Sequence, residues 1–63
     1  MARMLVVITI PAYNEEETIG DVIAEIKSVM AKTSYKYKIL VVDDGSVDNT
    51  SVVAKKAGAV VVT

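Results

Sequence analysis

Several residue types are missing from this 63-residue sequence, and each absence excludes a class of site. Cysteine is absent, which excludes disulfides and thiolate zinc sites. Histidine is absent too, which removes the commonest general base and metal ligand. A chain this short buries only about 60% of its unfolded surface. Residues 1–63 therefore form one domain at most, and a marginal one.

Charge and hydropathy give no sign of a nucleic-acid partner or a membrane span. Seven basic residues against eight acidic ones give a net charge of −1, without the basic face that nucleic acid requires. No apolar run approaches the roughly 18 residues of a membrane span. The apolar residues 4–10 are followed by Pro-Ala-Tyr-Asn, which is no signal-peptide cleavage site. The sequence therefore predicts a soluble, cytoplasmic chain.

Three apolar runs predict strands, and two periodic segments between them predict helices. The strands are expected at residues 4–10, 37–43 and 59–62, and the helices at 15–31 and from 48 or 49 to 57. The strand runs are apolar throughout rather than alternating, which is typical of parallel strands covered on both faces. Pro11 is expected to end the first strand because it cannot donate a ladder hydrogen bond.

The first helix is predicted from its spacing and from its ends. Its apolar stripe consists of Ile19, Val22, Ile23, Ile26, Val29 and Met30. Asn14 and Glu17 have the form of a capping box at its start. Gly20 lies inside this helix, where it would allow close approach to the sheet.

The second helix is predicted from its inner face and from the glycine that follows it. The inner face is expected to consist of Val52, Val53 and Ala57. Gly58 fits the C′ position just after the helix.

The order β-α-β-α-β predicts an α/β fold with a three-stranded parallel sheet. Right-handed crossovers give the spatial order 3-2-1, with both helices on one face of the sheet. The strands are apolar on both sides, however, so the other face would expose apolar area worth about 25 cal/mol per Å². Either the chain is the front part of a longer protein, or a second copy covers the open face.

Polar residues follow the first two predicted strands at the point where each strand ends. Tyr13 follows the first strand, and Asp43 and Asp44 follow the apolar part of the second. Neighbouring parallel strands end at the same edge, so these residues should share the crevice that binds ligands in open α/β folds. The tyrosine ring could stack on a base, while a carboxylate could accept hydrogen bonds from a base or a ribose. Backbone groups beside Pro11 and Val42 could flank the base.

Two interpretations stay open for several of these residues. Glu15 is either a ligand-binding residue or only a charge at the helix N-terminus, and Tyr13 either stacks on a ligand or packs as part of a lid. Successive strand residues point to opposite faces, so Asp43 and Asp44 should have different roles. One is expected to accept backbone N–H bonds in the turn, and the other to face the crevice. Asp48 is interpreted as a helix cap.

The common phosphate-binding motifs are absent. The three glycines form neither G-x-G-x-x-G nor a P-loop. The acidic residues 15–17 at the start of the first helix would repel a pyrophosphate from its N-terminus. A phosphate would therefore be held elsewhere, by a cation bound to acids that this chain does not contain.

Two segments together resemble a known family. IPAYNEEETI at residues 10–19 and ILVVDDGSVDNT at 39–50 resemble the start of the inverting family 2 glycosyltransferases, which have the Rossmann-like GT-A fold. The resemblance is to the polyprenyl-phosphate sugar transferases in particular, such as dolichyl-phosphate mannose synthase. It implies a nucleoside pocket lined by Pro11, Tyr13, Glu15, Val42 and Asp44, with Asp43 as a structural neighbour.

The resemblance also implies what the whole protein does. It would transfer a hexose from a GDP- or UDP-sugar to a polyprenyl phosphate at the cytoplasmic face of the membrane. The metal-binding Asp-x-Asp for Mg²⁺ or Mn²⁺, the catalytic base and the acceptor site come later in this family. Residues 1–63 would then be the nucleotide-binding N-terminal fragment, inactive alone and without catalytic or metal-binding residues.

Two alternatives remain. Residues 38–44 also look like the first strand and acidic metal pair of phosphoacceptor receiver domains. A complete strand and helix precede this segment, however, and the turn Gly45-Ser46 follows it, which is unlike a receiver domain. The other alternative is a non-catalytic fragment that self-associates through its open sheet.

Overall fold

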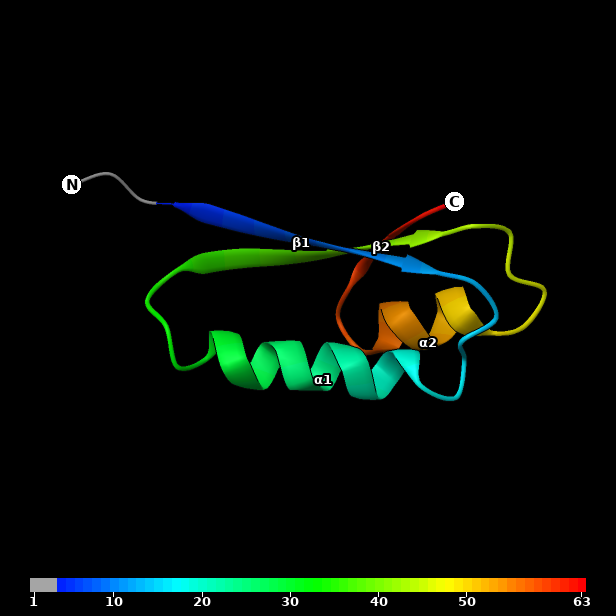
Figure 1. Cartoon of the computed structure of the whole chain (residues 1–63), viewed down its shortest axis with the longest axis horizontal. Helices are drawn as coiled ribbons and strands as arrows, with labels where there is room; N and C mark the ends of the chain where they lie inside the picture. Colours follow the sequence, from blue (N-terminus) through cyan, green and yellow to red (C-terminus); the bar gives the residue numbers. More distant parts are fainter. Residues whose placement is uncertain (1–3) are drawn as a thin grey trace.

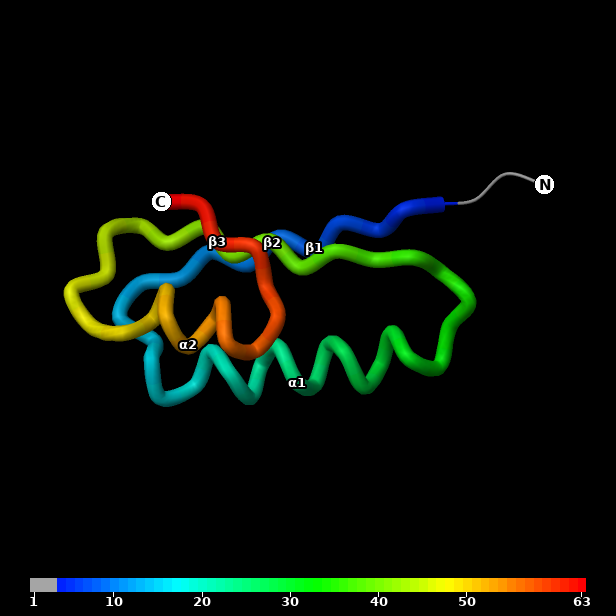
Figure 2. The backbone as a smooth tube through the Cα atoms, turned by 180° about the vertical axis from the view of Figure 1, so that it is seen from behind, coloured from blue at the N-terminus to red at the C-terminus, as the bar shows by residue number. Residues whose placement is uncertain are grey.

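The computed structural model describes residues 4–63, which form a three-stranded parallel sheet and two helices. The strands are β1 (Leu5–Ala12), β2 (Lys36–Asp43) and β3 (Val60–Val62), and the helices are α1 (Ile19–Met30) and α2 (Thr50–Lys56). The sheet order is β1-β2-β3, and both helices lie on one face of it (Figures 1 and 2). The predicted α/β fold, strand order and helix placement are confirmed. The first three residues of the predicted domain lie outside the described residues.

The core lies between the sheet and the helices. Ile19 and Ile23 of α1, Val41 of β2 and Ala54 of α2 are completely buried there, and Ile39 of β2 is 3% exposed. Burying an isoleucine or valine side chain stabilises a fold by about 1.5–3 kcal/mol. These few residues therefore hold the helices on the sheet.

The opposite face of the sheet is uncovered in this chain and carries apolar side chains. The exposed apolar residues of its strands include Leu5 and Val7 of β1, Val42 of β2, and Val60 and Val62 of β3. The exposed fraction alternates along β1, as expected for a strand whose successive side chains point to opposite faces. We refer to these five residues as the open apolar face. As predicted, the strands carry apolar side chains on both faces of the sheet, but the helices cover only one face.

Pro11 does not end the first strand, contrary to the prediction. It lies within β1, opposite Val42 of β2. Among the described residues β1 pairs only with β2, which makes β1 an edge strand. A proline is tolerated on an edge strand where its nitrogen faces away from the ladder. The strand therefore continues to Ala12.

Helix α1 begins four residues later than predicted, and the predicted capping box is wrong. Thr18 is the N-cap and makes no side-chain capping hydrogen bond. The backbone of Asn14 has a positive φ of 50°, and its side chain accepts a hydrogen bond from Val47 instead of capping the helix. Residues 16–18 form a turn that leads into the helix. Of the predicted stripe, Val22 and Val29 are exposed.

Helix α2 ends as predicted but buries a different face. Gly58 has a φ of 102°, its N–H bonds to the Lys55 carbonyl, and the Ala59 N–H bonds to the Ala54 carbonyl. This pair of bonds is a Schellman motif, in which glycine takes the C′ position. Val52, predicted to face inward, is 49% exposed.

The inner face of α2 is built on Thr50 and Ala54, which are both completely buried. Val53 and Ala57 pack against the core as predicted. Gly20 faces this helix rather than the sheet. A Cβ at Gly20 would lie 3.4 Å from Cγ1 of Val53, which is ordinary van der Waals contact.

Candidate functional site

The ends of β1 and β2 bring Tyr13 and Asp44 to one edge of the sheet. Ala12 and Asp43, the last residues of the two strands, lie opposite each other in the parallel register. The Asp44 N–H continues the ladder by donating to the Ala12 carbonyl at 2.9 Å. Tyr13, the next residue along the chain from Ala12, is 57% exposed, and Asp44 is exposed as well. Tyr13 and Asp44 therefore lie at the same edge of the sheet, and a ligand-binding crevice there remains a prediction.

The two aspartates have different environments, as the alternation of strand residues predicts. Asp43 is 5% exposed. Its carboxylate accepts the Ser46 N–H at 2.9 Å and the Ser51 hydroxyl at 2.5 Å. Asp43 is thus the carboxylate that ties down the turn, and Asp44 is the one left open to solvent.

Hydrogen bonding keeps Asp43 ionised. The Ser46 hydroxyl, the Ser51 hydroxyl and the Ser46 N–H all lower the pKa of Asp43, and burial of the carboxyl opposes them. The pKa of Asp48 is also lowered, chiefly by the Thr50 hydroxyl, with burial and the charge of Asp43 acting in the opposite direction. Both carboxylates are accordingly negative at neutral pH, and both are committed to holding the loops.

Two further predicted residues lie beside this edge, on the uncovered side of the sheet. Pro11 and Val42 are opposite each other in the register, and both side chains are exposed, Val42 to 37%. Pro11 lies two residues before Tyr13, and Val42 lies two residues before Asp44. The two exposed side chains form an apolar surface on which a flat aromatic ring can pack while its polar edge meets a carboxylate.

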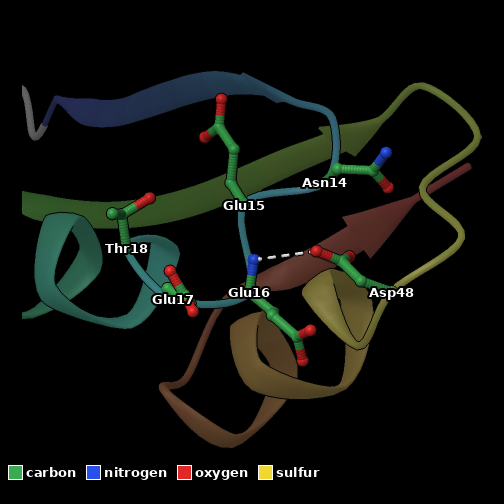
Figure 3. A pocket seen from close by; sticks show the side chains of 6 residues that line it. All are labelled: Asn14, Glu15, Glu16, Glu17, Thr18 and Asp48. Carbon is green, nitrogen blue, oxygen red and sulfur yellow. Dashed lines mark hydrogen bonds between the residues drawn. The ribbon is translucent and has the colours of Figure 1, made fainter.

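Glu15 lines a pocket beside the loop that follows β1. The other lining residues are Asn14, Glu16, Glu17, Thr18 and Asp48 (Figure 3). The pocket contains none of the other predicted site residues. Four carboxylates around one opening would repel a diphosphate, so this acidic pocket is a poor place for a nucleotide. Of the six predicted residues, five lie at the ends of β1 and β2, and Glu15 lines the acidic pocket two residues beyond Tyr13.

Hydrogen bonds between the two loops were not predicted from the sequence. Thr50 accepts the Glu15 N–H at 2.8 Å, and Asp48 accepts the Glu16 N–H at 3.2 Å. Asp48 also accepts the N–H of Thr50, the first residue of α2, so it supports the start of this helix as well as the neighbouring loop. These partners are more than 30 residues apart in the chain. Local sequence patterns carry no signal for such pairs.

The described residues offer neither a metal centre nor a membrane span. Within residues 4–63, no three histidine, cysteine, aspartate or glutamate side chains are grouped so that they could hold a metal ion. No helix in that range is long and apolar enough to cross a membrane.

Most of the chain matches a known protein family. Residues 7–62 match the model of glycosyl transferase family 2, and the chain belongs to this family. It is 48% identical over 54 residues to the uncharacterised protein MJ1222 of Methanocaldococcus jannaschii, covering 86% of this chain and 20% of that protein. It is 37% identical over 52 residues to the undecaprenyl-phosphate 4-deoxy-4-formamido-L-arabinose transferase of Pseudomonas fluorescens, covering 82% and 15%. The chain thus spans about a fifth or less of these relatives.

Solved structures share the fold of the chain. Mannosyl-3-phosphoglycerate synthase from Rubrobacter xylanophilus superposes with a TM-score of 0.86 at 35% identity, over 95% of this chain and 20% of that one. Glucosyl-3-phosphoglycerate synthase from Mycobacterium tuberculosis, in complex with Mn²⁺ and UDP-glucose, superposes with a TM-score of 0.74 at 39% identity. That match covers 97% of this chain and 21% of the other. The predicted family and its GT-A fold are confirmed, and membership of this family excludes the receiver-domain alternative.

Proposed function

We propose that this chain is the nucleotide-binding N-terminal part of a glycosyltransferase and that it binds the nucleoside half of a sugar nucleotide at the ends of β1 and β2. One observation carries the proposal: the Asp44 N–H to Ala12 carbonyl bond, 2.9 Å long, which brings Tyr13 and Asp44 to the same edge. The strand ends of an open parallel sheet are the usual place for such a ligand.

Each residue at this edge has a distinct role in the proposal. Tyr13 stacks on the base, and Asp44 accepts hydrogen bonds from a base N–H or from the ribose hydroxyls. Pro11 and Val42 flank the base from the uncovered side of the sheet. Asp43 makes no contact with the ligand but holds the turn that presents Asp44. Glu15 contributes only if the ligand extends past the sheet edge to the acidic pocket.

The reaction proposed for the whole protein is transfer of a hexose from a UDP- or GDP-sugar to a polyprenyl phosphate. The Pseudomonas fluorescens relative is named for an undecaprenyl-phosphate acceptor, and the Mycobacterium tuberculosis structure holds UDP-glucose. The latter makes UDP the first donor to test. Two structural neighbours are instead synthases of 3-phosphoglycerate sugars. That second acceptor class shares the phosphate group with the first.

We propose that the chemistry of transfer depends on groups that residues 4–63 do not supply. Within residues 4–63, no three histidine, cysteine, aspartate or glutamate side chains are grouped to hold a metal ion, and the Mycobacterium tuberculosis neighbour is a complex with Mn²⁺. We propose that a Mg²⁺ or Mn²⁺ site and a catalytic base lie elsewhere in the protein. This chain alone would then bind a nucleotide without turning it over. The cytoplasmic location predicted from the sequence, at the membrane face for the whole protein, remains a prediction.

Replacing Asp44 by asparagine tests the proposed site. Asp44→Asn removes the charge that would accept ligand hydrogen bonds, so UDP or GDP should bind about tenfold more weakly or worse. Calorimetric titration measures this change. The fold should be unaffected, because the Asp44 side chain is exposed and accepts no hydrogen bond from residues 4–63.

A matched control makes the same charge change elsewhere. Asp21 is exposed in the first turn of α1, and Asp21→Asn should leave nucleotide affinity unchanged. Equal binding by the Asp44→Asn variant and the wild type would remove Asp44 from the site.

A second proposal concerns the open apolar face. We infer that, where this chain occurs without further segments to cover it, two copies associate through Leu5, Val7, Val60 and Val62 of this face, leaving Val42 to the nucleoside site. The observation in favour is that Leu5, Val7, Val60 and Val62 are between 46% and 61% exposed on one side of the sheet. Exposed apolar side chains on one face of a sheet favour association.

A further inference from the structure

The loops that follow β1 and β2 are joined at Asn14. The Asn14 N–H donates to the Ser46 hydroxyl at 2.8 Å, and the Val47 N–H donates to Oδ1 of Asn14 at 2.9 Å. We refer to Asn14, Ser46 and Val47 with these two bonds as the Asn14 clasp. One residue of the first loop thus holds two successive residues of the second.

The backbone of Asn14 is adapted to this role. Its φ of 50° lies in the left-handed region, which most residues enter only at a cost. Asparagine is among the few side chains that tolerate it, because a short polar side chain can form compensating local bonds. At Asn14 the compensating bond is not local, since the donor is Val47, 33 residues further along the chain.

The clasp lies next to the proposed nucleoside-binding residues. Asn14 directly follows Tyr13, and Ser46 is two residues after Asp44. Tyr13, Asp44 and Val47 are all exposed, so packing does little to hold these loop residues in place. Beyond the last ladder bond, at Asp44, these two hydrogen bonds are the loop contacts nearest to Tyr13 and Asp44, and the bonds from Glu15 to Thr50 and from Glu16 to Asp48 follow them further along.

We propose that Asn14 is a positioning residue for the nucleoside site. It sets the distance between the Tyr13 ring and the Asp44 carboxylate, and thereby the affinity for the nucleotide, without touching the ligand itself. The inference rests on the proposed function, because it assigns a role within the same site. Pre-organised loops bind more tightly because less conformational freedom is lost on binding.

Two substitutions separate the side-chain bond from the backbone conformation. Asn14→Gly keeps the positive φ without strain but removes Oδ1, and Asn14→Asp keeps both the tolerance and the acceptor. Loss of one ordering hydrogen bond should weaken UDP or GDP binding by about threefold to tenfold in Asn14→Gly. In Asn14→Asp the affinity should stay within about twofold of wild type at high salt, which screens the added charge.

Hydrogen exchange at the Val47 amide reports the clasp directly. Exchange should be faster in Asn14→Gly and unchanged in Asn14→Asp. Ile26→Val serves as the stability control, because Ile26 is partly buried near the far end of α1. This control should lower the unfolding midpoint and leave nucleotide affinity unchanged.

The possible results distinguish failure of the positioning role from failure of the proposed nucleoside site. If Asn14→Gly exchanges faster at Val47 but binds UDP and GDP as the wild type does, the positioning role is overturned and the nucleoside site stands. If Ile26→Val weakens binding as much as Asn14→Gly, the effect is one of stability and the positioning role is again overturned. If the wild-type protein binds neither UDP nor GDP, the proposed function fails, and the positioning role fails with it.

Discussion

Two adjacent aspartates show how one residue position separates a structural role from a candidate binding role. Asp43 points to the helix side of the sheet, where two serines satisfy its carboxylate. Asp44 is exposed and uses its backbone N–H to join β1 and β2. Exchanging their roles would require a register slip of one residue, which turns every side chain of the strand to the other face.

Acid should loosen the turn that Asp43 holds. The pKa of Asp43 is lowered in the folded chain, so its ionised form contributes stability above its ordinary pKa, near 3.8. That stability is lost as the pH falls through the still lower pKa of the folded state. The free energy of unfolding, measured in urea at a series of pH values, should therefore fall as the pH drops below about 4.

The variant Asp43→Asn should be less stable than the wild type at neutral pH and should lose less stability on acidification. Asp48, whose pKa is also lowered, accounts for the part that remains. Asp21→Asn is the control and should follow the wild-type curve. Parallel pH profiles for Asp43→Asn and the wild type would contradict the assigned role of Asp43.

The sequence predicted the different roles of Asp43 and Asp44 because strand alternation is a local rule. It did not predict that Asn14 bonds to Val47, or that the buried Thr50 accepts the Glu15 N–H. Those partners become neighbours only after the sheet has formed. Asn14 was interpreted as a helix cap because its spacing to Glu17 is a local pattern that can be recognised in the sequence.

At the scale of elements, the glycine within α1 and the glycine that follows α2 have opposite conformational requirements. Gly58 follows α2 with a φ of 102°, a conformation that side chains rarely adopt. Gly20 lies within α1, where a Cβ would meet only Cγ1 of Val53 at ordinary contact distance, 3.4 Å. The same substitution should therefore have opposite signs at these two positions.

Gly58→Ala should destabilise the chain by about 1–3 kcal/mol because of backbone strain after α2. Gly20→Ala should stabilise it by about 0.5–1 kcal/mol, because alanine loses less freedom than glycine in a helix. Urea unfolding of both variants measures the two changes. A destabilised Gly20→Ala variant would show that α1 and α2 are packed more tightly at this point than 3.4 Å indicates.

The elements themselves were predictable, but not all of their ends. The apolar runs and the helical spacing identify all five elements in the right order. The start of α1 was predicted too early, since the acidic residues 15–17 look helical but lie outside the helix. The inner face of α2 was predicted to be entirely apolar, with Val52 facing inward. Instead Val52 is exposed and the polar Thr50 is buried, which is possible because its hydroxyl is hydrogen-bonded.

At the scale of the whole molecule, the uncovered face of the sheet leaves apolar side chains in contact with water. The chain spans about a fifth or less of the length of its curated relatives. In a longer protein, further segments could cover the open apolar face. A chain that ends here must leave it in water or cover it with a second copy.

Light scattering at increasing concentration tests the proposed association. The wild-type chain should form dimers, and Val60→Lys should shift it towards monomer by placing a charge on the open apolar face. Val47→Lys is the matched control, because Val47 is 88% exposed in the β2–α2 loop. A well-folded wild-type monomer at high concentration would contradict association through this face.

The central claim is that the strand ends carrying Tyr13 and Asp44 hold the nucleoside half of a sugar nucleotide. Amide chemical shifts of the isotope-labelled protein, followed by NMR during titration with UDP and then GDP, test it most directly. The predicted result is saturable shifts at Tyr13, Asp44 and their neighbours, with the far end of α1 unchanged. Shifts confined to the acidic pocket around Glu16 and Asp48, or none with either nucleotide, would contradict the claim.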